Sequence, residues 1–277
     1  MLGTFILVGA FVQQPRLLPR AACVRAPDVR ALAIAASFDI AAAEGDAAIH
    51  ECAEFFVQGF WVSGTTSGPA RGLSSSELEL LVSQQAEDMI GRYGELVAER
   101  KLRSEMLLAR DAEGSIRGCA GVEMALIAPQ VGNVLSRASS EALLKKELSS
   151  MDPSQRQGFR NMSAVELTRN LFPEYQCYAL LANLAVDASN RGSGLGKQLC
   201  AACETAAEAW GVAAIMLQVE ECNFPARALY SSVGYQDVHI DDNAVALRVE
   251  PGSGASSLLT QTKSSIVLMG KRVGLPS

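Results

Sequence analysis

Residues 183–196 decide the fold, and they read NLAVDASNRGSGLG. Their first part belongs to an apolar run, residues 178–186, which has the length of a buried strand. Their last part opens a helix that Gly211 can end in a left-handed cap. The apolar face of that helix carries Leu195, Leu199, Ala202, Cys203, Ala206 and Trp210. A second apolar run, residues 213–219, predicts another buried strand.

A glycine loop between a strand and a helix is an arrangement that binds phosphates. Glycines let the backbone approach the ligand, and the helix N-terminus adds about half a positive charge. Arg191 adds a fork of hydrogen-bond donors at the same place. The loop lacks the G-K-[ST] ending of a nucleotide P-loop and the third glycine of a dinucleotide fingerprint. Taken alone, this loop is weak evidence for a phosphate site, and a structural turn is the default interpretation.

A second motif lies at residues 223–235, which read NFPARALYSSVGY. Asn223 predicts the cap of a short helix, Pro225 falls in its first turn, and Gly234 follows its end. Asn223 and Tyr230 are seven residues apart, about two helical turns, so both side chains lie on one face.

These elements, in this order, resemble the GNAT (GCN5-related) N-acetyltransferase family. The acetyl-CoA signature Arg/Gln-x-x-Gly-x-Gly/Ala stands here as Arg191, Gly194 and Gly196. Residues 183–186 are similar to the family's fourth strand, and residues 223–235 to its second signature. The resemblance is clear over about residues 178–238. The Trp210-Gly211 ending and the Arg92-Tyr93-Gly94 segment are similar to plastid-type members, which acetylate protein amines.

The resemblance implies an α/β fold, the GNAT fold. We expect a mixed, mostly antiparallel sheet of six to seven strands with helices on both faces. The last strand is expected at residues 265–272, paired near the strand that starts at Tyr235. The fourth and fifth strands are expected to splay apart, which leaves the backbone of residues 184–186 free to bind the pantetheine arm.

The resemblance also implies acetyl-CoA as cosubstrate, without a metal. The residues expected to bind it are Leu184, Ala185, Val186, Arg191, Gly192, Ser193, Gly194, Leu195, Gly196, Lys197, Asn223, Phe224 and Pro225. A backbone amide of the splayed strand is expected to stabilise the oxyanion that forms during transfer.

Tyr230 is the expected catalytic residue, because its motif position implies a hydroxyl that protonates the leaving thiolate. Without the motif, it is a tyrosine packed at the end of an apolar helix face. The acceptor amine must lose a proton to a base or to a water relay. Glu123, Glu220 and Glu221 are candidate bases, although acidic residues near strand ends are usually solvated. Asn183 is a candidate for orienting a water.

The predicted function is transfer of acetyl from acetyl-CoA to protein amines, N-terminal or lysine, by direct attack on the thioester. One alternative is acetylation of a small-molecule amine, and another is a catalytically silent acyl-CoA-binding module. A redox protein working through Cys200 and Cys203 is a third alternative. The formal net charge of -6 argues against a nucleic-acid partner and suits basic acceptors.

The remainder of the chain predicts one domain with an insertion. Apolar spacing after Asp46 predicts one helix, and Ser74 with Glu77 forms a capping box that predicts a second. Strands are expected at residues 106–109 and 116–127, joined by a turn at residues 111–115. Residues 129–176 are predicted to be an insertion or lid, with a helix at residues 140–148.

Residues 1–36 are predicted to be a targeting presequence, and residues 37–277 the acetyltransferase domain. The first segment carries Arg16, Arg20, Arg25 and Arg30 against one acid, Asp28, and its apolar stretch is too short to span a bilayer. This composition favours a plastid (chloroplast) location, with the mitochondrion or cytoplasm as alternatives. Without the segment the net charge becomes -9, three charges more acidic.

The seven cysteines are odd in number and scattered, which indicates reduced thiols. Cys200 and Cys203 form a C-x-x-C in mid-helix with no second pair for zinc, so they are predicted to be helix-packing residues. The two histidines, His50 and His239, lie in no triad pattern and are expected to be exposed to solvent.

Overall fold

The computed structural model describes residues 38–63, 73–94, 102–250 and 258–274. Its main sheet runs in the order β1-β2-β3-β5-β6-β10-β7, with β4 paired to β3. The strands are β1 (Asp39–Ala42), β2 (Ser104–Arg110), β3 (Ile116–Ala128), β4 (Asn133–Val134), β5 (Gln176–Val186), β6 (Ala214–Glu220), β7 (Gln236–Asp241) and β10 (Ile266–Arg272). Only β5 and β6 pair in parallel, and the other pairings are antiparallel. The predicted mixed, mostly antiparallel sheet is therefore confirmed.

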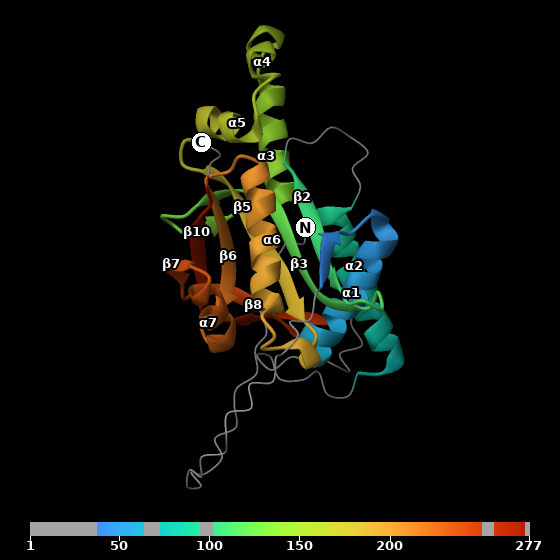
Figure 1. Cartoon of the computed structure of the whole chain (residues 1–277). Helices are drawn as coiled ribbons and strands as arrows, with labels where there is room; N and C mark the ends of the chain where they lie inside the picture. The colour runs from blue at the N-terminus through green and yellow to red at the C-terminus, as the bar shows by residue number, and fades with distance from the viewer. Residues whose placement is uncertain (1–37, 64–72, 95–101, 251–257, 275–277) are drawn as a thin grey trace, which may run out of the picture.

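Helices cover both faces of this sheet, as Figure 1 shows. They are α1 (Gly45–Phe56), α2 (Ser75–Tyr93), α3 (Arg137–Ser150), α4 (Pro153–Phe159), α5 (Ala164–Leu171), α6 (Leu195–Ala209) and α7 (Phe224–Ser232). A π-helical turn, η1 (Val57–Val62), extends α1, and a 3-10 turn, η2 (Ala188–Asn190), follows β5. A separate hairpin consists of β8 (Val245–Val249) and β9 (Leu259–Lys263).

The two largest of three hydrophobic core clusters among the described residues lie on opposite faces of the sheet. On the first face, α6 buries Leu199 and Cys203 against strand residues such as Val122. On the second face, α1 and α2 bury side chains such as Phe56 and Met89. The β8–β9 hairpin contributes to this second core. The sheet therefore lies between α6 and the α1–α2 pair, and the predicted helices on both faces are confirmed.

Local sequence signals place the start of α2 and the end of α6 where they were expected. Ser74 accepts a hydrogen bond from the backbone of Glu77, and the Glu77 carboxylate accepts one in return, so the predicted capping box begins α2. Gly211 adopts a left-handed φ of +73° just after α6. β10 pairs antiparallel with β7, which confirms the predicted position of the last strand.

Residues 129–176 form β4 and three helices. The expected helix at residues 140–148 is the middle of α3, whereas α4 and α5 were not predicted. Figure 1 shows α3 and α4 projecting away from the sheet. The buried side chains Leu144 of α3 and Leu167 of α5 join the core on the α6 face.

Among the residues described here, no helix combines the length and apolarity needed to cross a bilayer. The predicted presequence, residues 1–36, lies outside the described residues.

Candidate functional site

The parallel pairing of β5 and β6 is short. It runs from Ala179–Ile215 to Leu181–Leu217. Beyond this point β5 continues to Val186 beside β3, with a register shift between Cys119 and Gly121 of β3. The described pairing thus leaves residues 184–186 beside β3 alone, in agreement with the splay that the resemblance implies. All three side chains are buried.

The loop after β5 holds its glycines in backbone conformations that other residues rarely adopt. Gly192 has a φ of +79° and Gly194 a φ of +92°. Gly194 is the N-cap of α6, and its carbonyl accepts a hydrogen bond from the Lys197 backbone at 3.0 Å. The hydroxyl of Ser193 donates to the carbonyl of Asn190 at 2.6 Å. These bonds hold the loop directly before the positive end of the helix, where an anion is stabilised.

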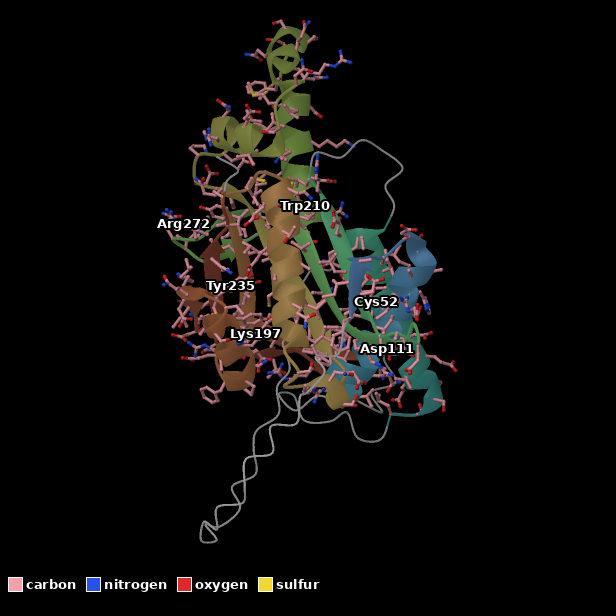
Figure 2. The ribbon with its side chains drawn as sticks, viewed as in Figure 1. Cys52, Asp111, Lys197, Trp210, Tyr235 and Arg272 are labelled. Carbon is pink, nitrogen blue, oxygen red and sulfur yellow. The ribbon has the colours of Figure 1, made fainter. Side chains whose placement is uncertain are left out.

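Two cationic side chains lie at this loop. The Nε of Arg191 donates to the carbonyl of Val186 at 3.3 Å and fixes the side chain against the end of β5. Partial burial lowers the pKa of the Arg191 guanidinium, and the nearby Asp187 carboxylate opposes that shift. Lys197 is exposed in the first turn of α6, and Figure 2 shows it at the opposite end of that helix from Trp210.

Gly196 brings three elements together. A Cβ at this position would lie 3.1 Å from Cδ2 of Leu229 in α7 and 3.9 Å from Cγ2 of Val186 in β5. A contact of 3.1 Å is tighter than most real Cβ contacts, so with a larger residue here the Leu229 side chain would have to shift by a few tenths of an ångström. The signature glycine therefore has a packing role in addition to the loop geometry.

The start of α7 faces the same region of the molecule. Asn223 is buried, and its Oδ1 accepts a hydrogen bond from the Ala226 backbone at 3.2 Å. Pro225 lies in the first turn, as predicted. Phe224, between them, is 64% exposed, which is unusual for a large aromatic side chain. An exposed aromatic ring beside a buried cap is consistent with the predicted contact to a ligand.

Tyr230 is fully buried, and no described residue makes a hydrogen bond to its hydroxyl. Burial raises the pKa of this phenol well above its usual range, so the group keeps its proton. Its ring centroid lies 5.8 Å from that of Tyr235, whose buried hydroxyl likewise lacks a partner in the described residues. An orphaned, protonated hydroxyl fits a proton donor that completes its hydrogen bond only with a ligand.

The candidate bases are engaged elsewhere. Glu123 is fully buried rather than solvated, and its carboxylate accepts bonds from Nε and Nη2 of Arg92 at 3.1 and 3.2 Å. Glu220 accepts bonds from Arg248 at 2.5 and 3.2 Å and from the Ser264 hydroxyl at 2.8 Å.

The expectation that acidic residues near strand ends are solvated is therefore wrong for Glu123 and Glu220. Arginines from distant segments pair with both of them. Glu221, in contrast, is exposed.

The cysteines and histidines have packing or surface positions. Cys200 and Cys203 are fully buried in α6, as predicted, and burial raises the pKa of Cys200 to about 12. His50 is half-exposed and lies 3.5 Å from Glu54. His239 is half-buried, because its ring lies against Gly132. A Cβ atom added to Gly132 would lie only 2.2 Å from Cδ2 of this ring. Within the described residues, no cluster of three metal-ligating side chains occurs.

Comparisons with known proteins agree with this geometry. Residues 166–235 match the model of the Acetyltransferase (GNAT) family. An 83-residue segment is 34% identical to the [ribosomal protein bS18]-alanine N-acetyltransferase of Haemophilus ducreyi. That alignment covers 30% of this chain and 54% of the relative, so the chain spans about half the length of the curated relative that it matches.

Solved structures also resemble the chain. The ribosomal-protein-S18-alanine N-acetyltransferase from Escherichia coli aligns at 15% identity with a TM-score of 0.46, over 87% of this chain and 97% of that one. Naa20 of Chaetomium thermophilum, solved with a bisubstrate analogue, aligns at 19% identity with a TM-score of 0.36, over 61% of this chain and 65% of that one. Residues 166–235 are thus similar to the Acetyltransferase (GNAT) family, and this segment contains β5, the glycine loop, α6, β6 and α7 of the site described above.

Proposed function

We propose that this protein transfers the acetyl group of acetyl-CoA to amines of polypeptides. The observation that carries the proposal is the loop of residues 191–197, which lies at the positive end of α6 beside the splayed end of β5. Its left-handed glycines, Arg191 and Lys197 suit the pyrophosphate of CoA. The edge of β5 that β6 leaves uncovered beyond Leu181 suits an extended pantetheine arm.

The same site contains groups suited to the transfer chemistry. A backbone amide near Leu184 stabilises the negative charge that develops on the thioester oxygen. Tyr230 supplies a proton to the departing thiolate, because its hydroxyl is neutral, buried and without a partner among the described residues. The acceptor nitrogen attacks directly, and no acyl-enzyme is needed.

The acceptor class rests on the relative and on charge. The Haemophilus relative is named a [ribosomal protein bS18]-alanine N-acetyltransferase. We therefore propose a polypeptide α-amine as the first acceptor to test, with the lysine ε-amine second. The net charge of -6 favours a basic acceptor protein.

A direct test uses three synthetic peptides with the purified protein and acetyl-CoA. The first begins with alanine and lacks lysine, the second has a blocked N-terminus and one lysine, and the third is blocked and lacks lysine. Mass spectrometry is expected to show acetylation of the first, and of the second if ε-amines are accepted, but not of the third. If only free polyamines or arylalkylamines become acetylated, the acceptor is a small molecule.

A catalytically silent acyl-CoA-binding module is the other candidate function. It would bind acetyl-CoA in a calorimetric titration with no acetylation of any amine. The unpaired hydroxyl of Tyr230 favours the enzyme, since a binding module has no use for a proton donor.

We also propose that residues 1–36 direct the protein to plastids, on the basis of their four arginines and single acid. A fusion of this segment to a fluorescent protein, expressed in an alga, tests the location. Accumulation in mitochondria or in the cytoplasm would reject the proposal.

A further inference from the structure

Asn183 has an unusual combination of properties. It is the one non-glycine residue with a positive φ, +52°, among the residues that the structure describes. Its side chain is 0% exposed. Neither Oδ1 nor Nδ2 has a hydrogen-bond partner among the described residues. Its main-chain oxygen, in contrast, accepts a hydrogen bond from the Cys119 thiol at 3.4 Å.

Each of these properties is unfavourable for folding. A left-handed conformation in a strand is strained for any residue with a Cβ, although asparagine tolerates it better than most. A buried amide without a partner loses its hydrogen bonds to water and gains none in return. An apolar residue or a glycine at this position would avoid the unpaired amide, and such uncompensated features cluster at functional sites.

The position of Asn183 in the fold links it to the proposed reaction. It lies two residues beyond Leu181, where the pairing of β5 with β6 stops. It directly precedes Leu184, whose backbone is proposed to bind the thioester oxygen. The strained residue is therefore the neighbour of the group that would contact the reacting carbonyl.

Two of the three candidate bases are already engaged in ion pairs, and the third, Glu221, is exposed. Arg92 holds Glu123 in a buried ion pair, and Arg248 and Ser264 hold Glu220. Both oxygens of each of these carboxylates already accept hydrogen bonds from those partners, which orient them away from an acceptor amine. An uncharged amide cannot accept the proton itself, but it can hold a water that does.

We propose that Asn183 is a positioning residue whose carboxamide holds the water that receives the proton of the acceptor amine. This proposal rests on the proposed function. An acceptor ammonium has one proton to lose before attack, and the water passes it to solvent. The neutral nitrogen then forms a bond to the acetyl carbon, and the bond from that carbon to sulfur breaks. The nitrogen loses its second proton and the thiolate gains one, so the products are the amide, CoA and one proton.

Two substitutions at this position separate catalysis from strain. Asn183→Gly and Asn183→Ala both remove the carboxamide, but only glycine adopts a φ of +52° freely. The alanine variant is expected to have a melting temperature roughly 2–4 °C below that of the glycine variant. If the amide holds the water, kcat for the alanine-terminated peptide falls by roughly tenfold to a hundredfold in both variants. The KM for acetyl-CoA is expected to stay within about twofold of the wild-type value in both.

The pH dependence of the loss in kcat distinguishes a water relay from a structural role. A purely structural role of Asn183 would not make this loss depend on the protonation of the acceptor amine. The α-amine of a peptide has a pKa of about 8. Above this pH the acceptor arrives largely neutral, and the water relay matters less. The loss of kcat in both variants is therefore expected to be largest near pH 7 and to shrink above about pH 8.

Three outcomes would overturn the proposal. If Asn183→Gly keeps the wild-type kcat, the amide has no part in the reaction. If activity simply follows thermal stability, so that only the alanine variant is impaired, the residue has a structural role. If the defect is the same at pH 7 and pH 9, the water relay is wrong. A wild-type protein that acetylates no amine would reject the proposed function itself, whereas an active wild-type protein with an active glycine variant would reject only the role of Asn183.

Discussion

The glycine loop on the α6 side of the sheet and the helix pair on the α1–α2 side are held by different kinds of interaction. On the α6 side, the loop and the ends of α6 and α7 depend on backbone geometry: left-handed glycines, an N-cap and a close approach at Gly196. On the α1–α2 side, side chains from distant segments fix the structure. Arg92 pairs with Glu123, 31 residues away, and Trp61 donates to Gln85, 24 residues away.

This difference suggests a division of tasks. Backbone geometry on the α6 side suits a cosubstrate with fixed structure, because glycine loops and helix ends bind phosphates by position. Long-range side-chain contacts on the α1–α2 side depend on which residues the chain brings together. Four variants test how sharply the two sides differ.

The largest effect is expected for Glu123→Gln. Arg92 is 4% exposed, and loss of its partner's charge leaves a buried guanidinium without full compensation. Breaking a buried pair in this way costs about 3–5 kcal/mol of unfolding free energy. The matched control is Asp237→Asn, which breaks the partly exposed pair with Arg227 on the α6 side. That variant is expected to cost less than about 1 kcal/mol. Urea denaturation measures both, and equal losses would contradict the contrast between the two sides.

The same contrast explains what could be predicted from the sequence. The loop, α6, β6 and α7 were predicted because their signals are local: glycines, caps and apolar periodicity within about 60 residues. The ion pair of Glu220 with Arg248 was not, since a distance of 28 residues along the chain leaves no local pattern. The β8–β9 hairpin was not predicted either. Asn183 was named as a candidate for orienting a water, but its positive φ and buried, unpaired amide appear only in the structure.

A smaller effect is expected for Tyr230→Phe. If the hydroxyl protonates the leaving thiolate, kcat falls by roughly tenfold to a hundredfold, because general acid catalysis contributes about that much or more. Tyr235→Phe is the matched control, since its ring lies 5.8 Å away and its hydroxyl is also buried. Steady-state kinetics with the alanine-terminated peptide compare the two. Unchanged turnover in Tyr230→Phe would exclude the tyrosine as the proton donor.

A test of the backbone's role compares two glycines of similar geometry. Gly194 has a φ of +92° and Gly211 a φ of +73°, and an added Cβ would meet no atom within 4 Å at either position. Replacement by alanine is therefore expected to cost each variant about 1 kcal/mol of stability through backbone strain alone. Only Gly194→Ala is expected to lower the affinity for acetyl-CoA, by about tenfold, because the loop that contains Gly194 is proposed to bind the phosphates. Isothermal titration calorimetry measures the affinities, and an equal loss in both variants would contradict the assignment of the loop.

The smallest effect is expected at the surface of the α1–α2 side. Glu51 of α1 accepts bonds from Nη1 and Nη2 of Arg110 at 3.1 and 2.6 Å, and both side chains are partly exposed. These hydrogen bonds lower the pKa of Glu51 below its ordinary value. A lowered pKa in the folded state contributes stability above the unfolded pKa of about 4.3, and that contribution is lost as the pH falls through the folded value.

The variant Glu51→Gln is accordingly expected to lose less than about 1 kcal/mol at pH 7, after solvent screening, and progressively less as the pH falls through the lowered pKa of Glu51. Glu54→Gln serves as the control, since its partner His50 lies 3.5 Å away and is half-exposed. Urea denaturation at pH 7 and at pH 3 gives the comparison. A deficit of the Glu51 variant that persisted unchanged at pH 3 would mean that packing, rather than charge, joins α1 to β2 at this point. Surface charge would then contribute as little on this side of the sheet as it does beside α7, and the contrast between the two sides would rest on the buried pairs alone.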